Sequence, residues 1–215
     1  MTESALRAEL AHAAQTLARQ GLSPGRSGNV SARFGGGLLI TPTGFAFETL
    51  APSDIAVIGL DGVPLARGRA PSSEWPMHAA VYAGRPDAKA IVHLHSRFAT
   101  ALSCLRRDIP AFHYMVATLG GDSVACAEYA TFGTDVLARN ALAAMPDGRR
   151  GCLLANHGQI VHGRSVDHAV ELAVELETLS MQYATTLTMG APTLLDSEEM
   201  ALMLEKFRTY GQPSE

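Results

Sequence analysis

Two histidines separated by one residue, His93 and His95, lie in a β-rich segment, residues 90–95, and could bind a metal ion. Residues two apart in a strand face the same side, so both imidazoles point together from backbone positions roughly 6 to 7 Å apart. Such a pair can converge on one cation at about 2.0 to 2.1 Å. Two hydrogen-bonded histidines that line a sheet have the same spacing, however, so the pair alone leaves metal binding open.

Two more residues could complete a metal site. The apolar segment 151–155 ends in Asn-His-Gly, a turn that presents His157 at the end of a strand. Glu74 stands in the predicted first turn of a helix that runs to Tyr82. Taken singly, His157 is an ordinary loop residue and Glu74 is an ordinary acid that stabilises the helix dipole. Taken with the histidine pair, they form a set of three nitrogens and one carboxylate, which suits zinc or a similar divalent ion.

Short polar residues in three predicted turns could bind an anion. They are Ser27, Gly28 and Asn29 before a predicted hairpin, Thr41, Thr43 and Gly44 after it, and Ser72 and Ser73 at the predicted helix start. Backbone N–H groups and short hydroxyls in such turns can cradle a phosphate, and so can a helix N-terminus. Turns and helix caps are built from the same residue types, and composition alone favours that structural interpretation.

The predicted elements that position these side chains alternate between helices and strands. Apolar periodicity predicts helices at residues 2–20, 71–82, 96–104, 134–145, 166–189 and 197–209. Extended segments are predicted at 30–34, 38–41, 55–60, 63–65, 90–95, 109–115, 124–129, 151–155 and 160–162. Because hairpins outnumber strand–helix–strand units, we expect an α/β domain whose mixed or antiparallel sheet is covered by helices.

Composition limits the classes of protein to which the chain can belong. With 215 residues, 47% of them hydrophobic, it can form one domain, residues 1–215, around a substantial core. A net charge of −4 with dispersed charges argues against nucleic-acid binding. No apolar run approaches the ~20 residues of a membrane span, so we expect a soluble, cytoplasmic protein. Three cysteines, Cys104, Cys126 and Cys152, lie in apolar surroundings, and we expect buried, reduced thiols.

Seven short motifs follow one another along the chain. They are Gly-Asn-Val-Ser at 28–31, Thr-Pro-Thr-Gly at 41–44, Pro-Ser-Ser-Glu at 71–74, His-Leu-His at 93–95, His-Tyr-Met at 113–115, Ala-Thr-Phe-Gly-Thr at 130–134 and His-Gly at 157–158. Their order and spacing resemble the class II aldolase/adducin family, and within it the L-fuculose-1-phosphate aldolases. The likeness extends through residues 206–211. It implies a class II aldolase-like fold, with a central, mainly antiparallel sheet of the nine-stranded type flanked by helices, and a homotetramer with active sites at subunit contacts.

The resemblance also implies roles for individual residues. The implied zinc ligands are His93, His95 and His157. Glu74 is implied to be a fourth ligand while substrate is absent and the general acid/base once substrate is bound. Mn²⁺ and Co²⁺ are alternative metals. The implied phosphate-binding residues are Gly28, Asn29, Thr43, Gly44, Ser72 and Ser73. Tyr114, from a neighbouring subunit, is implied to move a proton at the aldehyde-derived oxygen, and Phe132 and Tyr210 to shape the aldehyde pocket.

The reaction that the resemblance implies is retro-aldol cleavage of a ketose 1-phosphate, either L-fuculose 1-phosphate or a 5-deoxypentulose 1-phosphate, to dihydroxyacetone phosphate and an aldehyde. This reaction forms a carbanion next to a carbonyl group, and either a Schiff-base lysine or a metal ion must stabilise it. The only two lysines, Lys89 and Lys206, lie in polar segments rather than in the desolvated pocket that a Schiff base needs, which favours the metal. Departures from the family pattern at residues 25–27, 93–96 and Asn156 leave the aldehyde open.

Four alternatives use the same fold. They are a pentulose-phosphate 4-epimerase, a keto-acid phosphate decarboxylase, a dehydratase, and a metal-free, adducin-like binding module. An aspartate commonly replaces Glu74 in the epimerases of the family, so Glu74 favours cleavage. The complete set of one glutamate and three histidines argues against the metal-free module.

Overall fold

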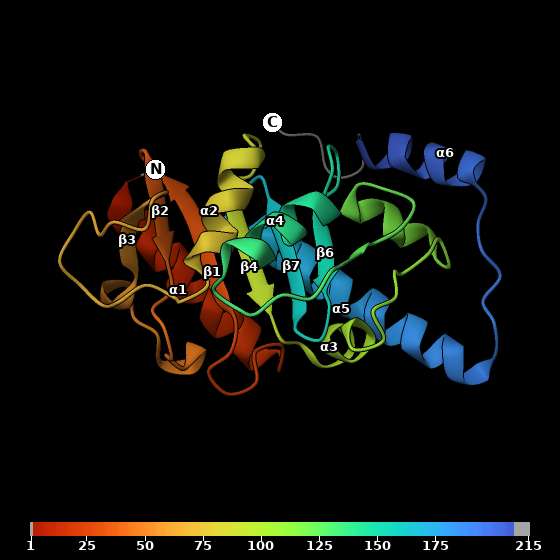
Figure 1. Ribbon diagram of the computed structural model, residues 1–215, viewed down its shortest axis with the longest axis horizontal. Helices are drawn as coiled ribbons and strands as arrows, with labels where there is room; N and C mark the ends of the chain where they lie inside the picture. The colour runs from red at the N-terminus through yellow and green to blue at the C-terminus, as the bar shows by residue number, and fades with distance from the viewer. Residues whose placement is uncertain (1, 209–215) are drawn as a thin grey trace.

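The computed structural model describes residues 2–208, and a seven-stranded sheet with the order β3-β2-β1-β4-β7-β6-β5 lies at its centre (Figure 1). The strands are β1 (Asn29–Phe34), β2 (Gly37–Ile40), β3 (Ala56–Gly59), β4 (Ala90–Leu94), β5 (Cys126–Ala127), β6 (Gly151–Leu154) and β7 (Gly158–Gly163). All neighbouring strands are antiparallel except β5 and β6, which confirms the expected mainly antiparallel sheet.

The described residues do not show the nine-stranded type of sheet. Further extended segments meet only in isolated bridges, such as Pro42 with Pro71 and Ile58 with Pro64. Proline has no N–H to donate to a longer ladder, so these segments stop short of becoming strands. The predicted strand 124–129 likewise shrinks to the two residues of β5.

Helices cover both faces of the sheet. The α-helices are α1 (Glu3–Arg19), α2 (Trp75–Gly84), α3 (Arg97–Ser103), α4 (Asp135–Ala144), α5 (Val166–Met189) and α6 (Ser197–Arg208), with short 3₁₀ turns η1 (Phe47–Thr49), η2 (Pro52–Asp54) and η3 (Tyr114–Leu119). Helices α2 and α4 pack together on one face, α1 and α5 cover the other, and α6 lies at the end of the molecule far from β3 (Figure 1). Among the described residues, no helix has the length and apolar character that a membrane crossing requires.

Strand β4 separates two apolar cores. Val92 and Leu94 face the core that contains α1 and α5, whereas Ile91 faces the core that contains α2 and α4. Because side chains alternate along a strand, His93 emerges on the same face as Ile91, under α2. The predicted alternation, with Leu94 opposite to the histidines, is confirmed.

Two predictions about local structure are wrong. Helix α2 begins at Trp75, so Glu74 is its N-cap residue rather than a first-turn acid, and no side chain caps this helix. The three cysteines are all free thiols, but only Cys152 is buried, while Cys126 is half-buried and Cys104 is exposed. Cys104 is the C-cap residue of α3, which ends at Ser103.

Candidate metal centre and its cavity

Strand pairing brings the predicted ligands together. Leu94 pairs with Gln159, so the β6–β7 turn that carries His157 lies beside the end of β4. A Cβ at Gly158 would lie 2.3 Å from the Leu94 carbonyl oxygen, so only glycine allows this close approach. Glu74 reaches the same point from the N-terminus of α2.

The four side chains converge on one point. His93 Nε2 lies 3.0 Å from His95 Nε2 and 3.2 Å from Glu74 Oε2, and His157 Nε2 lies 3.2 Å from Glu74 Oε1. The ligand atoms of the four residues all lie within 4.8 Å of one another. Ligands at about 2.0 to 2.1 Å from a tetrahedral zinc ion are about 3.3 Å apart, so the spacing fits such an ion.

The protonation states also fit a cation. The Nδ1 of His93 donates to the carbonyl oxygen of Gln159 at 2.8 Å, which leaves the lone pair of its Nε2 facing the centre. Burial, with the neighbouring imidazoles, lowers the pKa of His95 to about 4, so its ring is neutral at pH 7. Burial opposes ionisation of Glu74, but positive charge on the His93 and His157 rings, which a bound cation would supply in their place, holds the pKa of this carboxyl well below its usual range.

Glu74 Oε1 is a further sign that a cation belongs here. This carboxylate oxygen is buried and forms no hydrogen bond, although His157 Nε2 lies near it. A buried anionic oxygen without a donor is costly unless a cation or another partner satisfies it. The donor set, its spacing and this oxygen therefore all fit a divalent metal ion.

A cavity of about 330 Å³ opens onto three of the four ligands. It is lined by Ser73, Glu74, His95, Tyr129, Ala130, Phe132, Asn156 and His157. Phe132 is 64% exposed and stands at this cavity, where the resemblance places it. Sequence reasoning missed Tyr129, and it also missed Arg106, whose Nε donates to Asn156 Oδ1 at 2.8 Å, because no motif marks either residue. A substrate held at the ligands therefore has room for a small substituent against two aromatic rings.

The three predicted anion-binding turns lie side by side next to Glu74, and Ser73 of one of them also lines the cavity. Ser72 N donates to the Thr41 carbonyl at 3.0 Å, and the Thr43 N–H donates to the Ala70 carbonyl at 3.2 Å. Asn29 Nδ2 donates to Ser72 Oγ at 3.0 Å. The structure thus gathers Gly28, Asn29, Thr43, Gly44, Ser72 and Ser73 in one region; Asn29 and Ser72 are buried, whereas Thr43, Gly44 and Ser73 are exposed.

Of the predicted site residues that the structure describes, Tyr114 does not line this cavity. Tyr114 is 46% exposed, stacks on His113, and lies parallel to the ring of Phe207 in α6, with ring centroids 6.4 Å apart. Tyr210 lies outside the described residues.

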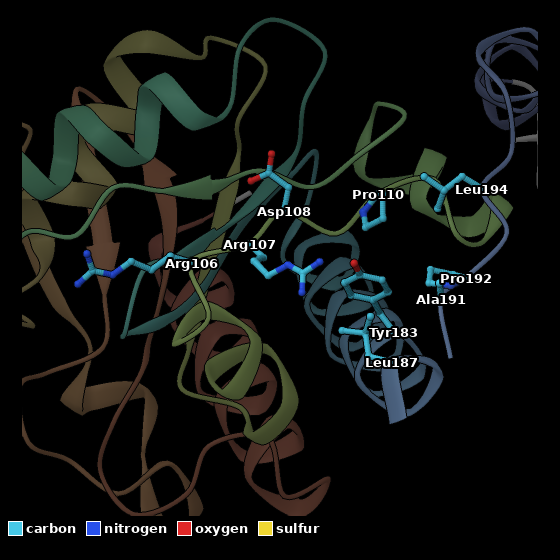
Figure 2. Close-up of a pocket in the computed structure, with 9 residues that line it drawn as sticks. All are labelled: Arg106, Arg107, Asp108, Pro110, Tyr183, Leu187, Ala191, Pro192 and Leu194. Atoms are coloured by element: carbon cyan, nitrogen blue, oxygen red, sulfur yellow. The ribbon is translucent and has the colours of Figure 1, made fainter. Parts of the chain in front are cut away.

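A second hollow, of about 600 Å³, lies beside α5. Figure 2 shows Arg106, Arg107 and Asp108 along one side of it and Tyr183 and Leu187 of α5 beside them, with the segment after α5 beyond. Its lining holds one carboxylate and no histidine or cysteine, so it does not offer a second set of metal ligands.

Comparison with known proteins gives one family. The class II aldolase and adducin N-terminal domain matches residues 8–184. The chain is 51% identical over 208 residues, 96% of its length and 93% of the relative's, to a 5-methylthioribulose-1-phosphate/5-deoxyribulose-1-phosphate aldolase of Rhodospirillum rubrum. It is 47% identical over 196 residues, 91% of its length and 90% of the relative's, to an L-fuculose phosphate aldolase of Escherichia coli K12. A solved structure of an L-fuculose 1-phosphate aldolase matches with a TM-score of 0.92 and 41% identity, covering 97% of this chain and 98% of that one.

Proposed function

The chain belongs to the class II aldolase and adducin family, and from this premise we propose that it is a metal-dependent aldolase that cleaves a ketose 1-phosphate to dihydroxyacetone phosphate and an aldehyde. The convergence of Glu74, His93, His95 and His157 at a cavity, next to turns rich in short polar residues, carries this proposal. The aldolase names of its relatives agree with it.

Three imidazoles and one carboxylate favour Zn²⁺ as the metal, with Mn²⁺ or Co²⁺ as alternatives. The bound cation would supply a Lewis acid that stabilises negative charge next to a carbonyl. Glu74 is the proposed acid and base that moves the proton at the reacting carbon. Its carboxylate is 7% exposed, stands at the cavity and is held by Asn29 Nδ2 at 2.9 Å, so it is both shielded from water and oriented.

The remaining residues would bind the two ends of the substrate. We assign the phosphate to Gly28, Asn29, Thr43, Gly44, Ser72 and Ser73, because their turns adjoin Glu74 and supply hydroxyls and an amide. Phe132, with Tyr210, would shape the aldehyde pocket. Tyr114 would serve the site of a neighbouring subunit in a homotetramer; its exposure, and its absence from the lining of its own cavity, support this assignment. A charged sugar phosphate as substrate also agrees with a cytoplasmic location.

The substrate can be identified with an assay that couples release of dihydroxyacetone phosphate to NADH oxidation. L-fuculose 1-phosphate, 5-deoxyribulose 1-phosphate and 5-methylthioribulose 1-phosphate form the panel, because the relatives are named for these compounds. We expect release from at least one of them, abolished by chelation and by His157→Ala. His12→Ala, which removes an exposed histidine of α1, is the matched control and should keep full activity. No release from any ketose 1-phosphate would overturn the proposal and favour the decarboxylase.

A further inference from the structure

A line of buried hydrogen bonds runs from helix α2 to Glu74. Tyr82 OH lies 2.8 Å from Ser31 Oγ, and Ser31 Oγ lies 2.7 Å from His78 Nδ1. His78 Nε2 lies 2.5 Å from Asn29 Oδ1, and Asn29 Nδ2 lies 2.9 Å from Glu74 Oε2. His78 stands four residues after Glu74, about one helical turn along the chain, and its two ring nitrogens bond Ser31 and Asn29 rather than a metal ligand.

The chemistry of the groups fixes the direction of every bond in this line. An ionised carboxylate only accepts, so Asn29 must present its NH₂ group to Glu74, and its Oδ1 then faces His78. Nε2 of His78 must therefore carry the proton and donate, which leaves Nδ1 to accept from the hydroxyl of Ser31. Ser31 Oγ in turn accepts from Tyr82. All donors point toward Glu74.

The line is isolated from water. His78 and Ser31 are 0% exposed, Tyr82 is 1% and Asn29 is 2% exposed. Burial lowers the pKa of His78 to about 3, so its ring is neutral at pH 7 and has one donor and one acceptor nitrogen. In such a setting an unpaired polar group is costly, so the orientation of each group depends on its neighbour.

Asn29 is the point at which this line meets the site. Its NH₂ group holds Ser72 Oγ and Glu74 Oε2 together, and Ser72 Oγ also accepts from the Glu74 N–H at 3.3 Å. A rotation of the Asn29 amide by half a turn would place Oδ1 against the carboxylate, with no donor between them. The N–H of His78 opposes that rotation, because only Oδ1 can accept from it.

We propose that His78 is a positioning residue of the active site: through Asn29 it holds the Glu74 carboxylate and the Ser72 hydroxyl in the orientation that the reaction needs. This inference rests on the proposed aldolase function. Displacements of about 1 Å in a catalytic group can cost about 100-fold in rate, and loss of a group that orients a metal ligand typically costs 10- to 100-fold in metal affinity. His78 therefore affects both the reaction rate and the metal affinity without contacting substrate or metal.

The test compares His78→Leu, which removes both ring nitrogens, with His78→Gln, which keeps a donor and an acceptor. For His78→Leu we expect a decrease in kcat of about 30- to 100-fold, a shift of the pH profile of kcat, and about tenfold weaker Zn²⁺ binding in competition with a chromophoric chelator. His78→Gln should recover most of each loss. Val81→Ala, a buried truncation in the same helix, is the control for lost stability and should leave all three quantities near the wild-type values.

Wild-type kcat, pH profile and zinc affinity in folded His78→Leu would overturn the inference. ¹⁵N spectra of histidine-labelled wild-type protein give a second measurement that needs no turnover: we expect a neutral ring protonated at Nε2 for His78, and a ring protonated at Nδ1 would refute the assigned direction even if His78→Leu failed to fold. Failure of wild-type protein to release dihydroxyacetone phosphate would instead refute the proposed function, while the spectra and the zinc titration would still decide the role of His78.

Discussion

Glu177 of α5 holds the start of α3 in place. Its replacement by glutamine measures how much this contact contributes to the free energy of unfolding. Its carboxylate is 9% exposed and accepts three hydrogen bonds: from Ser96 Oγ at 2.6 Å, from the Phe98 N–H at 2.8 Å and from the Ala99 N–H at 2.9 Å. Ser96 is the N-cap residue of α3 but makes no side-chain cap bond, so a glutamate from another helix satisfies these donors.

Glu177→Gln keeps the shape of the side chain and removes its charge. The amide oxygen can still accept from Ser96 and Ala99, but the NH₂ group then faces the N–H of Phe98, so one buried donor loses its partner. Hydrogen bonds to a charged group contribute about 1.5 to 3 kcal/mol each, about twice the contribution of neutral ones, so we expect a loss of about 3 to 5 kcal/mol in the free energy of unfolding. For a chain of this length the melting temperature should fall by roughly 10 °C.

The measurement is denaturant and thermal unfolding at one protein concentration, with Glu171→Gln as the matched control. Glu171 lies on the exposed side of α5, so its replacement should change the free energy of unfolding by less than about 0.5 kcal/mol. The effect of Glu177→Gln should also reach the metal ligands, because Gln159 Nε2 donates to Ser96 Oγ at 2.7 Å and its carbonyl oxygen accepts from His93. We expect zinc affinity to fall several-fold. A loss below about 1 kcal/mol would refute this account of α3.

Three further predictions address the site and its support. Glu74→Gln should still bind zinc through the three histidines but lower kcat by about 10³-fold, because general acid–base catalysis contributes 10² to 10⁴; retained turnover would refute its role. In metal-free protein the unfolded His78 takes up a proton near pH 6.5 and the folded one only near pH 3, so His78 should lower the free energy of unfolding by up to about 5 kcal/mol as the pH falls through this window, at 1.36 kcal/mol per pKa unit. His95, His162 and His168 contribute in the same direction, so His78→Gln should reduce the slope in urea titrations without abolishing it, and an unchanged slope would contradict the assigned contribution of His78. Gly28→Ala should lower the free energy of unfolding by about 2 to 3 kcal/mol, because Gly28 has φ +92° and a Cβ would lie 2.8 Å from the His93 carbonyl oxygen. Gly25 also has a positive φ but a Cβ there would meet no atom within 4 Å, so Gly25→Ala should cost only about 1 kcal/mol. Equal losses would show that the contact with His93 is unimportant.

The sequence predicted the parts of the site that depend on local geometry. Residues two apart on a strand share a face whatever the strand pairs with, so the common orientation of His93 and His95 followed from the sequence. The position of His157 did not follow, because it depends on the pairing of β4 with β7, between residues far apart in the chain. Residue type and the predicted turn made His157 a candidate third ligand, and the family resemblance then implied that it binds the same ion as the pair.

The supporting groups lay beyond sequence reasoning for the same reason. His78 and Ser31 are 47 residues apart, and Glu177 lies 81 residues from Ser96, so no local pattern connects them. Helix bounds were predicted to within one residue except for α2, which begins at Trp75 rather than at Pro71, and this one difference makes Glu74 the N-cap residue. Long-range pairing and exact helix ends are properties of the packed chain, which periodicity does not determine.

The pairing of β4 with both β1 and β7 has a consequence for how the cation and the fold depend on each other. The strand is hydrogen-bonded on both sides and backed by two apolar cores, so the sheet rather than the ion holds His93 in the strand and His95 directly after it. In small zinc domains the metal supplies the energy of folding and its removal unfolds the chain. Here the metal-free protein should remain folded and should bind a metal ion again. Co²⁺, which has a visible absorption spectrum, should therefore replace spectroscopically silent Zn²⁺ without a refolding step.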